Sequence, residues 1–275
     1  MPVLSQILLY PVKSLAGIQV QHWPVDRNGL VYDRKWMLID SEHRFLSQRR
    51  LPKMALIKTR IDGEMLILSA DGHGEIALPL QAQSGTSLEV EIWNDRCEAK
   101  TVGDEIDAWL SDFLQCHCRL VYHPEDRVRQ VDQRFAQSSD QTAFSDGFPF
   151  LIVSEGSLQA LNQAMGIEMP MNRFRPNLVV GDCAPYAEDG WRRIAVNGIA
   201  FRLPKPCSRC SVPTIDPETG IGGKEPLTTL NRLRKWDNKV FFGQNALHDQ
   251  CGELALGSTV EIVETGANQP PLLSH

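Results

Sequence analysis

Short apolar segments separated by glycine and proline are the feature that most restricts the fold of this 275-residue chain. At residues 18–21 and 88–92 apolar and polar side chains alternate, which is the period of a half-buried strand. Asp62 and Gly63 lie between two apolar runs and predict a β-hairpin. Further strands are expected at residues 7–10, 33–40, 54–61, 65–68, 119–122, 148–153, 174–180 and 258–263. So many short strands with tight turns favour a barrel or a sandwich.

Three longer segments repeat apolar residues at helical spacing. One apolar stripe runs through residues 106–114, and Asp104 and Glu105 before it suit the positive end of a helix dipole. A second helix is expected after Ser154, whose hydroxyl is placed to cap it. A third is expected to open at Glu225 and Pro226, because proline is favoured at the first helical position. The chain is therefore expected to be α+β and β-rich, with a few helices.

The composition limits the partners of the chain. Its formal net charge of −6 argues against nucleic-acid binding, where a basic face is expected. The N-terminus has no basic segment before its short apolar run, so neither a signal peptide nor a membrane anchor is expected. Seven cysteines, an odd number, without an export signal indicate a reduced cytoplasm rather than a disulfide framework.

Residues 123–141 are the best candidate for a linker. They are polar and rich in Asp, Arg and Gln, and we expect them to form a long loop. A chain of 275 residues is long enough for two domains. We therefore expect domains at residues 1–122 and 123–275, the first of them β-barrel-like.

Residues 204–220 are the segment most suggestive of chemistry. They hold Cys207 and Cys210 with Arg209 between them and several prolines nearby. Prolines fix φ and remove backbone donors, so a shaped loop is expected rather than a helix. A neighbouring guanidinium favours the thiolate, the form that binds metal or attacks an electrophile. The sequence thus predicts a cavity whose chemistry centres on Cys210.

The spacing of the two cysteines does not decide their role. A structural zinc site needs a second ligand pair, and the spacing of Cys116 and Cys118 is poor for that purpose. A thioredoxin-like pair would open a helix after a strand, which Pro206 and Pro213 disfavour. Two buried cysteines that act as small hydrophobic residues are an alternative that stays open.

Several cations recur where strands are expected to meet loops. Singly they are typical of a solvated surface, but together with nearby polar residues they predict a phosphate cradle, since arginine offers a planar fork to phosphate oxygens. The residues are Lys13, Ser14, Arg34, Arg49, Arg50, Arg173, Arg175, Asn177 and Ser208. The helix that follows Ser154 would add backbone donors for an anion, although simple capping is the favoured role of that serine. Binding of pyridoxal phosphate stays open.

Motifs of other enzyme classes are missing from the sequence. There is no Gly-x-Ser-x-Gly segment, no phosphate loop of nucleotide enzymes, no dinucleotide fingerprint and no His-x-x-x-His pair. The residues therefore indicate an anion-binding cavity with a reactive or metal-binding thiol, and they do not identify a substrate.

Four ordered motifs resemble those of MOSC proteins with an N-terminal MOSC β-barrel domain. The resemblance extends over nearly the whole chain, from about Val3 to Val263. The set of motifs is similar to that of the amidoxime-reducing members of the family and their bacterial relatives. The motifs are Tyr10-Pro-Val-Lys-Ser14, Asp33-Arg-Lys-Trp36, Arg173-Phe-Arg-Pro-Asn177 and Pro206-Cys-Ser-Arg-Cys210 followed by Thr214-Ile-Asp-Pro217. It implies an N-terminal β-barrel-like domain followed by a MOSC β-barrel domain.

The resemblance also implies a cofactor and an activity. The cofactor of the family is molybdenum on a pyranopterin, the molybdenum cofactor, and its thiolate ligand corresponds to Cys210. Residues that correspond to the family's cofactor-binding positions, less distinctively for Arg49, are Lys13, Ser14, Arg34, Arg49, Ser154, Arg175, Asn177, Ser208 and Arg209. The activity implied is two-electron reduction of small N-hydroxylated compounds, and the alternative is a carrier of cofactor or sulfur without turnover.

Two departures from the family pattern bear on partners and substrate. Some bacterial relatives end in a ferredoxin domain, and this chain stops at His275 without the cysteine run of such a domain, so electrons are expected from a separate ferredoxin, flavodoxin or reductase. The segment after the expected ligand, Ser211-Val-Pro-Thr214, differs from the Ile-Leu-Thr-Thr of the mitochondrial members, and it places Pro213 close to the expected metal. Substrate preference is therefore not carried over.

Overall fold

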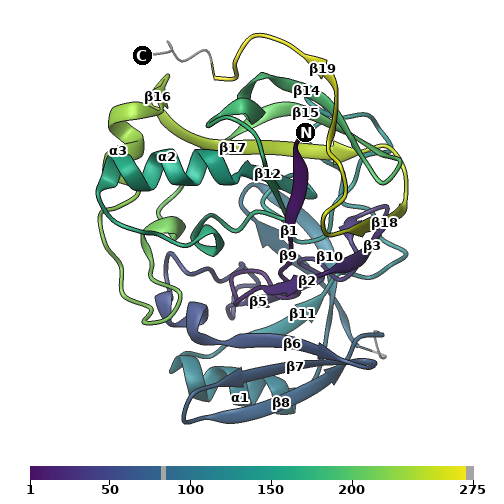
Figure 1. Cartoon of the computed structure of the whole chain (residues 1–275). Coiled ribbons are helices and arrows are strands. Elements are labelled where there is room, and N and C mark those ends of the chain that lie inside the picture. Colours follow the sequence, from purple (N-terminus) through teal and green to yellow (C-terminus); the bar gives the residue numbers. More distant parts are fainter. Residues whose placement is uncertain (82–84, 271–275) are drawn as a thin grey trace.

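The computed structural model describes residues 1–81 and 85–270 and is rich in β-structure (Figure 1). Within the described part of the chain, α-helix is confined to α1 (Asp104–Leu114), α2 (Glu155–Met165) and α3 (Leu227–Leu233). Short 3₁₀ helices connect other elements: η1 (Pro52–Leu56), η2 (Met171–Phe174), η3 (Ala187–Gly190) and η4 (Val212–Thr214). The β-rich α+β class and the three expected helices are confirmed.

The largest sheet has nine strands and brings distant parts of the chain together. Its order is β19-β14-β15-β17-β12-β13-β1-β2, and β16 pairs with β17. The strands are β1 (Val3–Leu9), β2 (Ile18–Val20), β12 (Phe150–Ser154), β13 (Leu178–Gly181), β14 (Trp191–Val196), β15 (Ile199–Ser208), β16 (Lys235–Trp236), β17 (Lys239–His248) and β19 (Glu261–Thr265). Because β1 pairs with β13, the N-terminal strand lies in a sheet built mostly by the C-terminal half. The domain boundary between residues 122 and 123 stays a prediction.

Both faces of this sheet are covered by apolar side chains. Along β1, Ile7 and Leu9 pack into one core cluster, and Leu8 packs into another on the opposite face. This alternation follows from the two-residue period of a strand. Helices α2 and α3 cover the Leu8 face (Figure 1), while the other face curves into a half-barrel. The strand alternation therefore decides which N-terminal side chains reach each face.

Three smaller sheets complete the fold, with orders β5-β11-β10-β9, β18-β3-β4 and β6-β7-β8. Their strands are β3 (His22–Asp26), β4 (Gly29–Leu30), β5 (Trp36–Ile39), β6 (Lys58–Asp62), β7 (Met65–Ala70), β8 (Gly74–Pro79), β9 (Ser87–Ile92), β10 (Asp95–Thr101), β11 (Arg119–Tyr122) and β18 (Gly252–Ala255). The hairpin at Asp62 and Gly63 is confirmed, since Asp62 pairs with Met65 across the turn.

Most expected strands have a counterpart, and several segments differ. The strand predicted at 54–61 begins only at Lys58, because Pro52 opens the 3₁₀ helix η1 through Leu56. Several strands were not predicted, namely β3, β4, β8, β10 and β14–β18. In β10, for example, the sequence is charged and half-exposed, and pairing with β9 sets its position. Residues 123–141 contain no helix or strand, as expected, yet Arg129 and Val131 within them are buried.

The cysteine segment is more regular than its prolines suggest. The loop predicted from residue 204 is wrong for residues 204–208, which belong to strand β15 and pair with β17. The register shifts between Arg202 and Lys205 and again between Pro206 and Ser208. Prolines are accepted at such irregularities because no ladder amide is needed there. Arg209 and Cys210 then leave the sheet, and Val212 begins η4.

Candidate functional site

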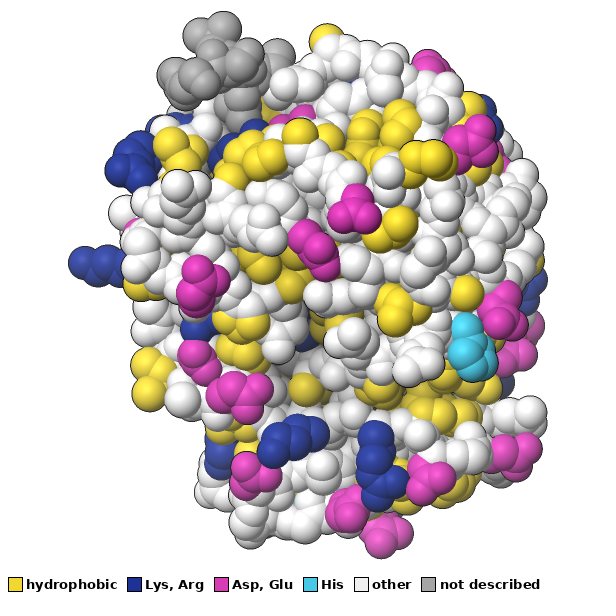
Figure 2. Space-filling model, viewed as in Figure 1, with side chains coloured by type: hydrophobic (Ala, Val, Ile, Leu, Met, Phe, Trp, Pro, Cys, Tyr) yellow, Lys and Arg dark blue, Asp and Glu magenta, His cyan; other side chains and the backbone are white. Residues whose placement is uncertain are grey.

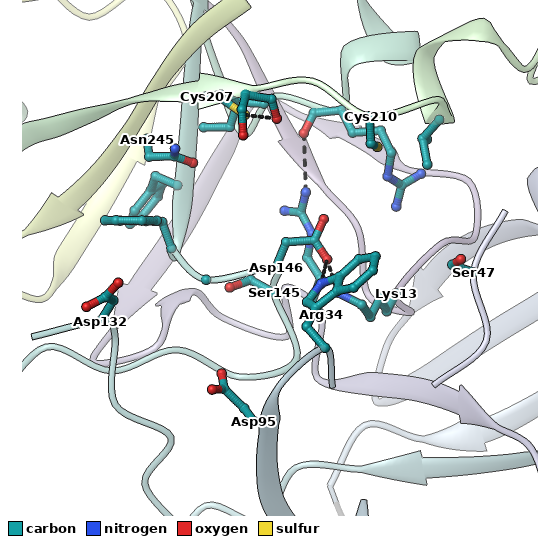
Figure 3. A pocket seen from close by; sticks show the side chains of 18 of the residues that line it. Lys13, Arg34, Ser47, Asp95, Asp132, Ser145, Asp146, Cys207, Cys210 and Asn245 are labelled. Carbon is teal, nitrogen blue, oxygen red and sulfur yellow. Dashed lines mark hydrogen bonds and ion pairs between the residues drawn. The ribbon is translucent and has the colours of Figure 1, made fainter. Parts of the chain in front are cut away.

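A cavity of about 750 Å³ lies where the N-terminal motifs meet the cysteine segment. Of the residues predicted from the sequence, nine line it: Lys13, Ser14, Arg34, Arg49, Arg175, Asn177, Ser208, Arg209 and Cys210. Figure 3 shows Cys207 and Cys210 on one side and Lys13, Arg34 and Asp146 facing them. Segments more than 100 residues apart in the sequence thus form one site.

The first two motifs interlock to hold Lys13 and Arg34. Val12 bridges Trp36 in parallel, and the Lys13 amide donates to the Trp36 carbonyl at 2.8 Å. The Tyr10 amide donates to Asp33 Oδ1 at 2.8 Å, and Asp33 also forms an ion pair with Arg34. Burial raises the pKa of Asp33, and the Arg34 cation offsets part of that rise. The carboxylate is therefore a structural partner that fixes both motifs.

Lys13 is buried, and its ammonium group contacts an acid within the cavity. Its Nζ donates to the Phe144 carbonyl at 2.8 Å and to Asp146 Oδ1 at 2.5 Å. Burial lowers the pKa of Lys13, and Asp146 counteracts that effect. The Asp146 side chain is 69% exposed and lines the cavity. The enclosing walls disfavour its charge, but the Lys13 cation outweighs them and holds the pKa of Asp146 below its ordinary range.

Arg34 and Arg175 lie on the ring of Tyr10. Their guanidinium carbons are 4.4 and 4.2 Å from the ring centroid, distances at which a cation is attracted to an aromatic face. Arg175 Nη1 donates to the Leu15 carbonyl at 2.6 Å, and Arg175 Nη2 is buried without a partner in the described chain. Burial, assisted by the Arg34 cation, lowers the pKa of Arg175 to about 10, so it remains charged at neutral pH.

Three residues of the cavity wall have left-handed backbone conformations. The φ angles of Ser14, Arg34 and Arg175 are 69°, 47° and 56°. Each such conformation is unfavourable for a residue with a side chain and persists only where the surrounding structure enforces it. Residues of this kind cluster at binding sites, which fits the predicted role of these three.

The two thiols differ in their surroundings. Cys207 Sγ accepts a hydrogen bond from Arg209 Nη1 at 3.1 Å and packs against the core under α2 and α3. Arg209 also donates through Nη2 to the Phe174 carbonyl at 2.7 Å, so it ties this segment to the motif that carries Arg175. Burial raises the pKa of Cys207, with Arg209 opposing the rise. In the described chain the half-buried Cys210 thiol has no hydrogen-bond partner.

The remaining predicted residues contribute unequally. The buried amide of Asn177 accepts from Leu151 and donates to Leu8, so it fastens β1 to β12 and β13. The Arg49 guanidinium carbon lies 4.3 Å from the centroid of the Trp93 ring. Ser208 is exposed at the end of β15. All three residues line the cavity, but Asn177 is held by hydrogen bonds within the protein, whereas the side chain of Ser208 is exposed.

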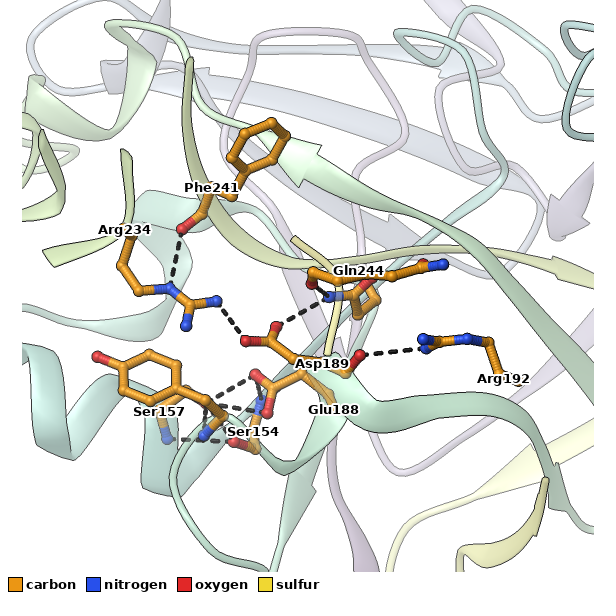
Figure 4. A network of polar contacts seen from close by, with 10 residues as sticks. Ser154, Ser157, Glu188, Asp189, Arg192, Arg234, Phe241 and Gln244 are labelled. Atoms are coloured by element: carbon orange, nitrogen blue, oxygen red, sulfur yellow. Dashed lines mark hydrogen bonds and ion pairs between the residues drawn. The ribbon is translucent and has the colours of Figure 1, made fainter. Parts of the chain in front are cut away.

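Ser154 is the exception, because it does not line the cavity. Its hydroxyl caps α2 by accepting from the Ser157 amide at 3.1 Å, and its side chain is fully buried. The anion at this helix N-terminus is the chain's own Glu188, which accepts from Ser154 N and from Ser157 Oγ (Figure 4). The geometry therefore supports capping, with Glu188 already accepting from the donors of Ser154 and Ser157.

The sequence missed several residues of the wall. They are the cations Arg129, Arg134 and Lys205, the acids Asp95, Asp132 and Asp146, and the aromatic residues Phe45 and Trp93. Arg129 donates to the carbonyls of Ala143 and Ser145 and to Asp95, so the polar loop is part of the site and not a free linker. The repeated arginines of residues 123–141, in an otherwise acidic chain, were the feature of the sequence that could have indicated Arg129 and Arg134.

The cavity has the opposite charge to the whole chain. Eight Lys and Arg side chains line it against three Asp side chains, while the chain carries a formal net charge of −6. Three of these cations pair with the three acids, namely Lys13 with Asp146, Arg129 with Asp95 and Arg134 with Asp132. Of the other five, Arg34 pairs with Asp33, which does not line the cavity. Arg49, Arg175, Lys205 and Arg209 have no acidic partner in the described chain. A concave wall rich in cations attracts an anionic ligand. The thiol at its edge suits a ligand that also contains a metal with affinity for sulfur.

Comparison with known proteins defines the class of the chain. Residues 1–117 match the MOSC N-terminal beta barrel domain, and residues 139–261 match the MOSC domain. The chain belongs to the family of MOSC proteins that carry this N-terminal domain. No helix in the described ranges combines the length and the apolar character needed to cross a membrane.

Two kinds of relatives stand out. Mitochondrial amidoxime-reducing component 1 of Mus musculus is 32% identical over 94% of this chain and 80% of its own length. The human protein of the same name is 31% identical over the same shares of the two chains. Molybdenum cofactor sulfurase of Oryza sativa subsp. japonica is 30% identical over 87% of this chain, which corresponds to 32% of the sulfurase.

Proposed function

We propose that this protein is a molybdenum-cofactor-dependent reductase of N-hydroxylated compounds, with the metal held by the Cys210 thiolate. The observation that carries the proposal is the cavity itself, in which an unpartnered thiol faces an excess of cations. The names of the relatives, an amidoxime-reducing component and a molybdenum cofactor sulfurase, support the same cofactor.

The residues present fit such a group. A soft thiolate suits a metal already bound by sulfur, and the buried Arg175 Nη2 and Arg209 Nε donors lack partners in the described chain. Cys210 would bind the metal. The cofactor's phosphate would be bound among Lys13, Ser14, Arg34, Arg49, Arg175, Asn177, Ser208 and Arg209. The cavity volume of about 750 Å³ falls within the usual range of cofactor sites.

The reaction proposed is the conversion of R–NHOH, two electrons and two protons into R–NH₂ and water. When bound, the cofactor supplies the electron pair that cleaves the N–O bond, while the protein supplies binding, orientation and electrostatics. Lys13 and the arginines hold the anionic group, and Arg209 fixes the cysteine segment against Phe174. Asp146, with its pKa below the ordinary range, stays ionised and keeps Lys13 charged.

The electrons are proposed to come from a separate donor protein of the ferredoxin, flavodoxin or reductase type. In a direct test the purified, cofactor-loaded protein receives electrons from chemically reduced viologen, and the amine or amidine formed from a hydroxylamine or amidoxime is quantified. The reductase proposal predicts turnover in the wild type and none in Cys210→Ala.

A carrier of the cofactor or its sulfur is the second candidate, favoured by the resemblance to the sulfurase. The same assay separates the two functions. Tight cofactor binding with no reduction of either substrate would contradict the reductase and support the carrier. Transfer of the bound cofactor to a cofactor-free molybdenum enzyme would then be the positive measurement.

A further inference from the structure

A second cavity, of about 760 Å³, shares the Arg175 side chain with the first. Its wall comes from the β1–β2 region, η1, β6, η2 and residues 217–218. In Figure 2 this face of the molecule is hollowed between the main body and the β6–β8 sheet below it, with Lys and Arg side chains on the lower side. Nothing in the proposed reaction uses this space.

Three residues of the second cavity carry buried donor atoms without partners in the described chain. They are the Tyr10 hydroxyl, Arg173 Nε and Arg175 Nη2. Tyr10 is 1% exposed, so its hydroxyl is excluded from bulk water as well. A buried donor left without a partner is destabilising, which makes an unfilled arrangement of three such atoms unfavourable. Burial raises the pKa of Tyr10 to about 12, so its hydroxyl keeps its proton and donates at neutral pH.

The charges of the cavity point to the same kind of ligand. Four cations line it, Lys53, Lys58, Arg173 and Arg175, against Asp71 and Glu218. Lys58 pairs with Asp71, and Arg173 pairs with Asp216, so Lys53 and Arg175 are the cations without an acidic partner in the described chain. The amides of Gln6 and Gln19 add neutral polar groups to the wall, which suit hydroxyl or carbonyl groups next to the charged end of a ligand. Cations, a protonated hydroxyl and unpaired guanidinium donors together favour the binding of an oxyanion.

We propose that this cavity is a second binding site, separate from the cysteine cavity, for a small polar molecule that bears a phosphate or a carboxylate. The Tyr10 hydroxyl and the Arg175 guanidinium contact the oxyanion, and Lys58 at the rim attracts it. Arg175 is shared with the proposed cofactor site, so the second site is tested through Tyr10 and Lys58, which line only this cavity.

Inorganic phosphate and citrate, titrated separately by isothermal calorimetry at constant ionic strength, test the site. Tyr10→Phe removes only a hydroxyl that makes no hydrogen bond within the protein, so it is expected to fold normally. It should weaken binding at the second site by about tenfold or more, since a hydrogen bond to a charged group is lost. Lys58→Glu, an exposed rim substitution, should weaken the same binding.

Lys13→Ala is the matched control, because Lys13 lines the first cavity and not the second. Because phosphate can also bind in the first cavity, Lys13→Ala should lose that binding event and keep the second-site event, whereas Tyr10→Phe and Lys58→Glu should lose only the second-site event. This pattern supports the second site, and the anion that binds there more tightly gives its class. The proposal is overturned if neither anion binds, if Tyr10→Phe binds like the wild type, or if Lys13→Ala alone abolishes binding. In each of these cases the assignment of Cys210 is untouched.

Discussion

Two clusters of charged and polar side chains in this molecule differ in how many of their hydrogen-bonding groups are left without a partner in the described chain. At the N-terminus of α2, all four carboxylate oxygens of Glu188 and Asp189 accept hydrogen bonds from the protein itself (Figure 4). In the cysteine cavity, cations outnumber acids and a thiol has no partner in the described chain (Figure 3). A closed network stabilises the fold, whereas surplus donors around open space indicate a ligand.

The largest effect is expected from breaking the closed network. Arg234 Nη2 lies 2.5 Å from Asp189 Oδ2, and both side chains are almost fully buried. Arg234→Met leaves Asp189 as an unpaired buried charge and should lower the free energy of unfolding by about 3–5 kcal/mol. Urea unfolding followed by circular dichroism measures it.

Arg96→Met is the control for that substitution. Arg96 pairs with Glu89 at the surface, where both side chains are about two-thirds exposed. Its removal should change stability by roughly 0–1 kcal/mol. Equal losses in the two variants would show that the network at α2 is no more important than a surface pair.

The next effect concerns the open cluster. Arg175→Met removes one of the cations that face the cysteine cavity and should weaken cofactor retention about tenfold or more, because a hydrogen bond to a charged group is lost. The remaining pairs are screened by salt, so the deficit should grow at higher ionic strength. Molybdenum content after gel filtration at low and high salt measures this.

Arg193→Met, at an exposed pair with Asp249 outside the cavity, should behave like the wild type in the same experiment. Full cofactor retention by Arg175→Met at high salt would reject the cradle.

A pH shift is expected from the acid of the cavity. Burial lowers the pKa of Lys13 and Asp146 raises it again, so Asp146→Asn should lower the pKa of Lys13 further. Anion binding needs the ammonium form, which exists below that pKa and disappears above it. Phosphate binding to the cysteine cavity, measured against pH in the Tyr10→Phe background so that the second cavity does not contribute, should therefore be lost at a lower pH when Asp146→Asn is added. Identical midpoints would mean that Lys13 does not bind the anion.

The smallest effect is expected at Cys207. Its thiol is packed in the core and accepts from Arg209, so Cys207→Ala should cost about 1 kcal/mol of stability, the size of one hydrogen bond. Cofactor content should not change. A loss of cofactor as large as that in Cys210→Ala would remove the distinction between the two thiols.

The sequence predicted the helices and most strands because their side-chain periods are local. A cradle of Lys13, Arg34 and Arg175 was predicted from cations that recur where strands meet loops, and the resemblance supported it. The pairing of β1 with β13 that brings them together is not visible in their spacing. Asp146 and Trp93 were missed because their roles arise from contacts across the cavity, with Lys13 and Arg49.

Two local expectations are changed by distant segments for the same physical reason. The prolines at 204 and 206 were expected to shape a loop, but residues 204–208 belong to β15, whose irregular pairing with β17 accommodates them. At Ser154 the favoured role of capping is seen, and the other expectation, an external anion, meets Glu188, 34 residues further along the chain, which accepts from this helix end. In both cases a distant segment changes what the local sequence permits.

The most direct test of the central claim is the molybdenum content of the protein produced in a host that makes the cofactor. We expect stoichiometric molybdenum in the wild type and in Cys207→Ala, and its loss in Cys210→Ala. A wild type without molybdenum, or equal molybdenum in Cys210→Ala, would contradict the assignment of Cys210 as the metal ligand.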